Sequence, residues 1–179
     1  MRSLALIAAL AAGPACATSL EIDVAGQANG TVTVDLFEDV APQHVERITE
    51  LASSGAYDGV AFHRVIEGFM AQTGDVSCGT EGASCPAGTG GSDMPNLPAE
   101  FSDRPFERGV VGMARSMDPD SANSQFFIMF APAPHLNGQY TVVGEVTDGM
   151  DVVDAITRGS GQGGEVAEPD RMTAVRVTE

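Results

Sequence analysis

The order of apolar and polar residues predicts a chain built mostly from short β-strands. Runs rich in β-branched and aromatic residues recur between turn residues, a pattern typical of strands in an antiparallel sheet. Eight such runs occupy residues 21–24, 31–37, 60–66, 69–73, 109–113, 125–130, 141–146 and 172–177. Asn29 and Gly30 form a dipeptide typical of tight hairpin turns, and we expect them to join the first two strands.

Two further segments have the spacing of amphipathic helices. Pro42 suits the first turn of a helix, Val45 and Ile48 follow on one helical face, and Gly55 is placed as a stop. Residues 148–157 predict a second helix. Because strands and helices do not alternate and no internal repeat occurs, we expect one mainly β domain, an antiparallel barrel or sandwich capped by two helices.

The first residues differ from the rest of the chain. Arg2 is followed by an apolar run over residues 4–12 and by Ala-Cys-Ala at 15–17, a pattern typical of a cleaved secretory signal peptide. The run is too short to span a bilayer. The sequence therefore predicts a signal peptide over residues 1–17, a mature domain over residues 18–179 and no membrane attachment after cleavage.

The net charge of the chain argues against two classes of binding partner. It carries 25 Asp and Glu against nine cationic residues, all of them Arg, and its formal net charge is -16. Such a chain is repelled by phosphate backbones and anionic lipid surfaces, so we expect it not to bind nucleic acid or membranes nonspecifically. We expect a soluble monomer.

A Gly-, Pro- and Ser-rich segment over residues 75–98 is longer than most connections and holds two cysteines. In an exported chain, Cys78 and Cys85 are expected to form a disulfide across this short loop. A metal site needs three or four ligands, and the spacing is not that of a redox C-x-x-C pair, so we expect no metal. Cys16 lies in the predicted signal peptide, where its neighbours match a lipid-attachment site poorly.

Candidate chemistry concentrates in residues 62–75, which read FHRVIEGFMAQTGD. Strand periodicity sets Arg64 among apolar and amide side chains. Considered alone, this arrangement is also compatible with a surface arginine whose aliphatic part covers the core. The three histidines, His44, His63 and His135, lie in unrelated contexts, and no nucleophile elbow or phosphate-binding loop is present.

Residues 62–75 resemble the F-H-R-x-I-x-G-F-M-x-Q-x-G-D block of the cyclophilins, the cyclosporin-type peptidyl-prolyl cis-trans isomerases. Residues 113–115 (MAR), 123–128 (NSQFFI) and 136–138 (LNG) are similar to the remaining blocks of that family, in the same order. The similarity extends from about residue 32 to residue 158. The resemblance implies an eight-stranded antiparallel barrel capped by two helices, with no cofactor.

The same resemblance implies roles for individual residues. Arg64 matches the catalytic arginine, Gln72 the residue that orients it, and Phe127 the apolar pocket for the substrate proline. Further substrate contacts are implied for Phe69, Met70, Ala114, Arg115, Gln125, His135, Leu136 and Tyr140. For Phe127 and Leu136, ordinary core packing is the alternative interpretation.

The implied activity is rotation about X–Pro peptide bonds, and the signal sequence places it in the folding of exported proteins. Arg115 and the tight segment at 121–124 look like bacterial members of the family, which suggests a Gram-negative periplasm. The partners are then proline-containing peptides and unfolded exported proteins. The alternative is a non-catalytic proline-peptide-binding module or holdase that uses the same groove. His135 stands where cyclosporin-sensitive members carry Trp, and Glu67 and Thr73 also depart from the family pattern.

Overall fold

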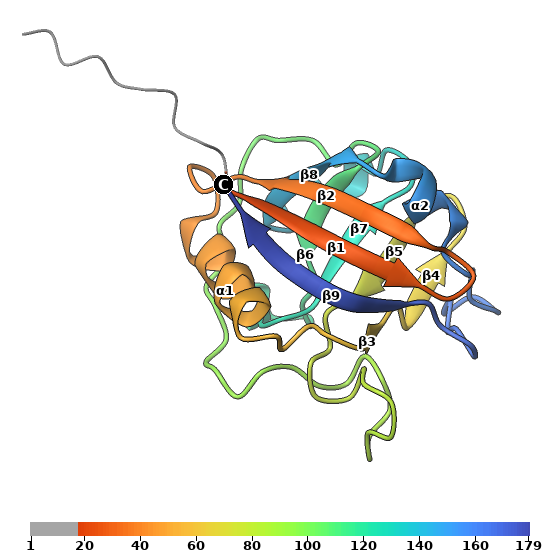
Figure 1. The fold of residues 1–179 in the computed structure, drawn as a ribbon. Coiled ribbons are helices and arrows are strands. Elements are labelled where there is room, and N and C mark those ends of the chain that lie inside the picture. Colours follow the sequence, from red (N-terminus) through yellow and green to blue (C-terminus); the bar gives the residue numbers. More distant parts are fainter. Residues whose placement is uncertain (1–17) are drawn as a thin grey trace, which may run out of the picture.

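A computed structural model describes residues 18–179; the predicted signal peptide, residues 1–17, lies outside them. One antiparallel sheet forms most of the molecule, and its strands follow the spatial order β3-β9-β1-β2-β8-β6-β7-β5-β4 (Figure 1). The strands are β1 (Ser19–Ala25), β2 (Gly30–Leu36), β3 (Val60–Ala61), β4 (Arg64–Ile66), β5 (Met70–Thr73), β6 (Val110–Met113), β7 (Phe126–Met129), β8 (Val142–Asp148) and β9 (Arg171–Thr178). The helices are α1 (Pro42–Ser53) and α2 (Met150–Ala155), with short 3₁₀ turns at Pro119–Ser121 and Pro134–Leu136.

The structure has nine strands where the sequence predicted eight, because residues 60–66 form two strands rather than one. Phe62 and His63 separate β3, which pairs with β9, from β4, which pairs with β5. The backbone N–H of Phe62 donates to Asp170 O at 2.9 Å, which keeps the segment beside β9. Since β3 and β4 are the two edges of the sheet yet only two residues apart, the sheet curls until its edges meet. The predicted antiparallel barrel with two helices is confirmed.

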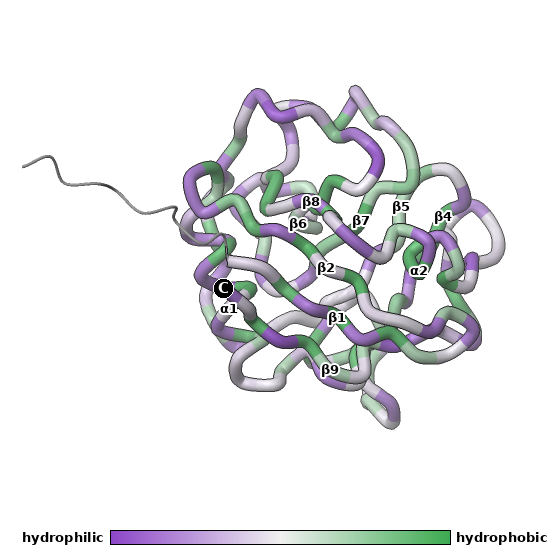
Figure 2. Tube along the Cα trace, turned by 45° about the horizontal axis from the view of Figure 1, so that its top comes forward, coloured by the Kyte–Doolittle hydropathy of each residue, from purple (hydrophilic) through white to green (hydrophobic). Residues whose placement is uncertain are grey.

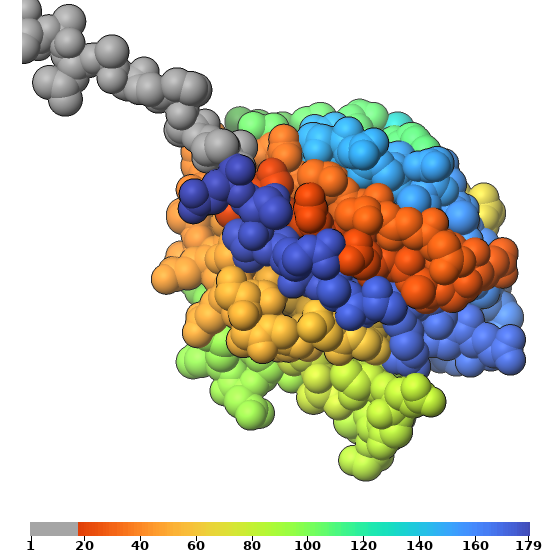
Figure 3. Space-filling model, viewed as in Figure 1, coloured from red at the N-terminus to blue at the C-terminus, as the bar shows by residue number. Residues whose placement is uncertain are grey.

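Alternating side chains build the core between the sheet and α1. Leu20, Ile22 and Val24 of β1 are buried while their neighbours are partly exposed. Figure 2 shows hydrophobic and hydrophilic residues alternating along this part of the sheet. Helix α1 buries the apolar face that contains Val45 and Ile48. In Figure 3, β9 runs as a blue band beside β1, and the chain near residue 80 protrudes as a yellow-green lobe at the lower edge.

The predicted hairpin and first helix are confirmed, and the second helix is shorter than expected. β1 and β2 pair antiparallel through the turn before Gly30. Helix α2 ends at Ala155, whereas the sequence predicted residues 148–157, because the buried Asp170 carboxylate accepts the N–H of Thr157 at 2.6 Å and draws the chain out of the helix. Neither described helix is long and apolar enough to cross a membrane.

Candidate active site

Three side chains lie in one row across three neighbouring strands. The register pairs Arg64 of β4 with Gln72 of β5, and Gln72 with Phe127 of β7. Directly opposed residues of antiparallel strands project from the same face of the sheet. The pairing therefore sets a guanidinium, a carboxamide and an aromatic ring side by side.

A pocket of about 310 Å³ opens on this face beside Arg64. Its apolar lining comes from Phe69 in the β4–β5 turn, Met70 of β5, Phe127 of β7, and Leu136 of the second 3₁₀ turn. Arg64, Gln72, Ala114, Arg115, His135 and Tyr140 complete the wall. The structure thus brings together every residue that the resemblance assigned to substrate except Gln125, which lines the adjoining pocket.

The floor of this pocket is rigid because its aromatic rings pack against one another. Phe127 stacks on Phe106 with ring centroids 5.7 Å apart and meets the edge of Tyr140 at 5.9 Å. A Cβ at Gly112 would lie 2.7 Å from Phe127 Cζ and 2.5 Å from Phe106 Cε1, so only glycine leaves room for both rings. Phe127 therefore both packs in the core and faces the pocket, and Leu136, in the same apolar cluster, does the same.

The Arg64 guanidinium is held at the rim of the pocket by neutral groups. Its Nε–H donates to Gly163 O at 2.9 Å, and Nη1 donates to Gln72 Oε1 at 3.1 Å. Within residues 18–179, Arg64 forms no ion pair with a carboxylate. Since amide and carbonyl oxygens orient the group without neutralising it, its charge remains available to a ligand in the pocket.

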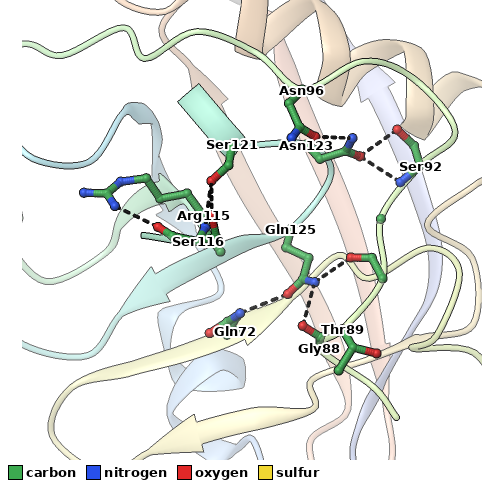
Figure 4. Close-up of a pocket in the computed structure, with 13 residues that line it drawn as sticks. Gln72, Gly88, Thr89, Ser92, Asn96, Arg115, Ser116, Ser121, Asn123 and Gln125 are labelled. Atoms are coloured by element: carbon green, nitrogen blue, oxygen red, sulfur yellow. Dashed lines mark hydrogen bonds between the residues drawn. The ribbon is translucent and has the colours of Figure 1, made fainter. Parts of the chain in front are cut away.

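A chain of hydrogen bonds runs from Arg64 into the long loop. Gln72 Nε2 donates to Gln125 Oε1 at 3.0 Å, and Gln125 Nε2 donates to the carbonyls of Gly88 at 3.2 Å and Gly90 at 2.8 Å (Figure 4). Each amide uses its oxygen toward one neighbour and its nitrogen toward the next, so the bonds fix the orientation of both glutamines. The carbonyls of the loop thereby help to set the position of Arg64.

The buried carboxylate of Asp75 organises that loop. Its Oδ1 accepts the N–H of Ser77 and Cys78, and its Oδ2 accepts those of Gly88 at 2.7 Å and Gly90 at 2.9 Å. Burial alone would raise the pKa of Asp75, but these four N–H donors lower it below its usual value. The ionised carboxylate therefore links the start of the loop to the two glycines whose carbonyls hold Gln125.

The expected disulfide between Cys78 and Cys85 is present, with Cα atoms 5.3 Å apart. It closes the protruding part of the loop. The bonds from Asp75 to Gly88 and Gly90 lie outside the closed ring, so they do not depend on it directly.

We expect replacement of Cys78 and Cys85 by Ser to lower the free energy of unfolding by about 2.5 kcal/mol, the chain-entropy value for a loop of this length. Because Asp75 still holds Gly88 and Gly90, turnover should remain within about twofold of wild type. Denaturant melts of the oxidised protein and of the double variant measure the first value. Intact mass before and after reduction is the control, since a gain of two protons identifies the bridge; a turnover loss above tenfold would contradict this account.

A second pocket of about 480 Å³ adjoins the first (Figure 4). Gln72, Ala114 and Arg115 line both pockets and form the wall between them. No sequence pattern predicted the polar side chains of this second pocket, chiefly Thr89, Ser92, Asn96 and Asn123. Asn123 belongs to the NSQFFI block, which was the only signal that could have indicated them; the others come from a loop without periodicity.

Of the three histidines, His135 lines the first pocket, with its ring centroid 5.8 Å from that of Phe69. His44 is a buried residue of α1, and its Nδ1 lies 2.6 Å from Glu100 Oε2. His63 is buried, and burial lowers its pKa. Among residues 18–179, no three His, Cys, Asp or Glu side chains are grouped to hold a metal ion.

The chain is similar in sequence to known isomerases. The family model for cyclophilin type peptidyl-prolyl cis-trans isomerases matches residues 20–177. A probable peptidyl-prolyl cis-trans isomerase of Brucella suis is 60% identical over 148 residues, which cover 80% of this chain and 76% of that protein. A peptidyl-prolyl cis-trans isomerase of Helicobacter pylori is 39% identical over 135 residues, covering 73% of this chain and 76% of that protein.

Solved structures show the same fold. A cyclophilin type isomerase of Cryptosporidium parvum superposes with a TM-score of 0.79 at 24% identity, over 92% of this chain and 99% of that one. The cyclophilin AquaCyp293 of Hirschia baltica superposes with a TM-score of 0.72 at 25% identity, over 88% and 72% of the two chains. Sequence and fold agree, and the chain belongs to the cyclophilin-type peptidyl-prolyl cis-trans isomerase family.

Proposed function

We propose that this isomerase acts on X–Pro bonds of unfolded exported proteins in a bacterial periplasm, as a monomer, with Arg64 as its catalytic residue. The observation that carries the catalytic assignment is the Arg64 guanidinium, held by Gln72 and Gly163 at the rim of an apolar pocket. The signal-like pattern of residues 1–17 and the Cys78–Cys85 disulfide, a bond typical of oxidising compartments, support export.

The chemistry needs no bond to break. Partial double-bond character sets a barrier of about 18–20 kcal/mol to rotation of a peptide bond. When the amide twists, conjugation is lost and the proline nitrogen regains its lone pair. A donor that binds this nitrogen only in the twisted state lowers the barrier, and each 1.36 kcal/mol of such selective binding gives about a tenfold rate increase.

The residues of the first pocket suit this task. The apolar floor made by Met70, Phe127 and Leu136 receives the proline ring and excludes water. Arg64 then presents N–H donors to the nitrogen of that ring from the rim, where its charge is not neutralised. Gln72 acts as a positioning residue, because its amide oxygen holds Nη1 of Arg64.

The test of the cellular role uses the full chain expressed in a Gram-negative bacterium. Its mature form should be recovered from the periplasmic fraction with a mass that corresponds to residues 18–179. This form should accelerate the proline-limited refolding of an exported protein, and the Arg64→Ala variant should not. Equal assistance by both proteins would identify a holdase instead, and retention of the intact chain in the cytoplasm would overturn the export proposal.

His135 is expected to limit cyclosporin binding. Relative to Trp, imidazole offers less apolar area and is better solvated, so a bound drug loses contact area and an indole N–H partner. His135→Trp should tighten cyclosporin binding at least about tenfold, the worth of one such hydrogen bond, with little change in the turnover of short peptides. Titration of the drug against isomerase activity in both proteins measures this. Tight inhibition of the wild type would show that position 135 does not control drug binding.

A further inference from the structure

The two adjoining pockets together form a groove, and this groove differs in charge from the rest of the molecule. The chain has 25 acidic residues and a net charge of -16, yet no Asp or Glu lines either pocket. The ionisable side chains that do line them are Arg64, Arg115, His135 and Tyr140. The groove is therefore a cationic strip on an acidic protein, which indicates selection of a ligand by charge.

Arg115, like Arg64, is a partly exposed cation of this strip. Its Nε and Nη2 donate to Gln139 O at 3.2 and 2.8 Å, and Nη1 donates to Ser116 O at 2.8 Å. Its Cζ lies 4.3 Å from the centroid of the Tyr140 ring. These three bonds use three of the five guanidinium N–H donors and leave two for a ligand. No carboxylate of the described chain forms an ion pair with Arg115.

The position of Arg115 suits a selective contact. It lines both pockets, so a peptide whose proline fills the first pocket and whose chain crosses into the second passes beside this guanidinium. Asp118 and Asp120 lie on the neighbouring turn but accept the backbone N–H groups of Asp120 and Ala99. Neither lines a pocket, and neither forms an ion pair with Arg115.

The acidic residues elsewhere on the protein do not cancel the attraction between Arg115 and a peptide carboxylate in contact with it. Exposed charges farther away than about 8 Å are largely screened at physiological ionic strength. A peptide carboxylate that reaches the free N–H donors of Arg115 forms a charge-assisted hydrogen bond. We propose that the groove selects proline peptides that carry an acidic residue within two positions of the proline, and that Arg115 is the residue that determines this preference.

This inference rests on the proposed function, and a set of matched peptides separates the two. The substrates are acetylated, amidated tetrapeptides with Glu, Gln or Lys placed in turn at the two positions before proline and the one after it. NMR exchange spectroscopy gives kcat/KM, and chemical-shift titration of the same samples gives Kd. At one position, the Glu peptide should exceed its Gln counterpart about fivefold in kcat/KM, as expected for a partly exposed ion pair, and the Lys peptide should fall below both.

Variants of the same protein assign the effect. Arg115→Gln should abolish the Glu-to-Gln ratio, and Arg115→Lys should retain part of it because the charge remains. Arg176→Gln is the matched control, because it also removes one cation. Arg176 of β9 pairs with Glu21 and Asp23 of β1 and lines neither pocket, so this variant should leave the ratio unchanged. Raising the salt to 1 M should reduce the ratio toward one.

Two results would overturn the inference: equal values for Glu and Gln peptides at all three positions, or a preference that survives Arg115→Gln. Failure of the proposed function looks different, because then even the Gln peptides would not be isomerised. The ratio of Kd values would still measure charge selection in that case.

Discussion

Arg64→Ala is expected to lower kcat by a factor of about 10²–10³, the usual loss when one preorganised donor to the transition state is removed. Because the proposed contact with the proline nitrogen forms only when the amide is twisted, kcat and kcat/KM should fall together while peptide affinity changes little. The free energy of unfolding should fall by less than about 1 kcal/mol, since the side chain is only half buried and both its partners can bind water instead. NMR exchange on a short X–Pro peptide and a denaturant melt measure both quantities.

Two further variants separate charge from geometry. Arg64→Lys keeps the cation but loses the planar fork that bonds Gly163 and Gln72 together, so it should recover only a small part of the lost rate. Arg108→Gln removes a cation that pairs with Asp154 outside both pockets and should turn over like wild type. Wild-type turnover in Arg64→Ala would show that the guanidinium is not the catalyst.

The sequence predicted most of the barrel because its strands are rich in β-branched and aromatic residues, the first hairpin has an Asn-Gly turn, and Pro42 indicates the start of the first helix. The prediction from sequence was wrong where the pattern of apolar residues does not show which strand is the pairing partner. Residues 60–66 read as one apolar run, but β3 and β4 pair with opposite ends of the sheet, and only the curl of the whole sheet decides this. Helix α2 ended early for a related reason, since its limit is set by Asp170, a residue distant in sequence.

The first pocket was predictable and the second was not. Arg64, Gln72 and Phe127 lie on strands whose register follows from alternation, so a resemblance in sequence carries over directly to their positions. Thr89 and Ser92 belong to a loop of Gly, Pro and Ser whose path depends on hydrogen bonds rather than on an apolar face. The acidic composition did not predict the charge of the groove, because the charged side chains that line the two pockets are arginines.

Asp75 accounts for much of that loop path, and its removal should have the largest effect on stability. Asp75→Asn keeps one acceptor oxygen but turns an NH₂ group toward two backbone N–H donors, either those of Gly88 and Gly90 or those of Ser77 and Cys78. Two hydrogen bonds are lost and donors face each other in a buried site. We expect the free energy of unfolding at pH 7 to fall by about 2–5 kcal/mol, because each of the two buried groups left without a partner costs about 1–3 kcal/mol. Denaturant melts measure this value.

The pH dependence gives an independent test with a definite sign. Because the folded-state pKa of Asp75 lies below its usual value of 3.8, the carboxylate stabilises the fold above that value. This contribution is lost as the pH falls through the lower folded-state pKa. Wild type should therefore lose stability relative to Asp75→Asn on acidification below about pH 4, and the difference between their melts should shrink.

Loss of the Asp75 carboxylate should also lower the isomerase activity. In either orientation of the amide, two of the four N–H bonds that hold the loop are lost. The carbonyls of Gly88 and Gly90 then shift away from Gln125, and Gln72 is free to turn away from Arg64. We expect kcat for Asp75→Asn to fall about tenfold, roughly the worth of one misplaced hydrogen bond, at a temperature where the variant is still folded. The double Ser variant of Cys78 and Cys85 is the matched control, because it loosens the same loop but leaves the Asp75 bonds in place. If both variants lose the same activity, general loop order rather than the path through Gln125 positions Arg64.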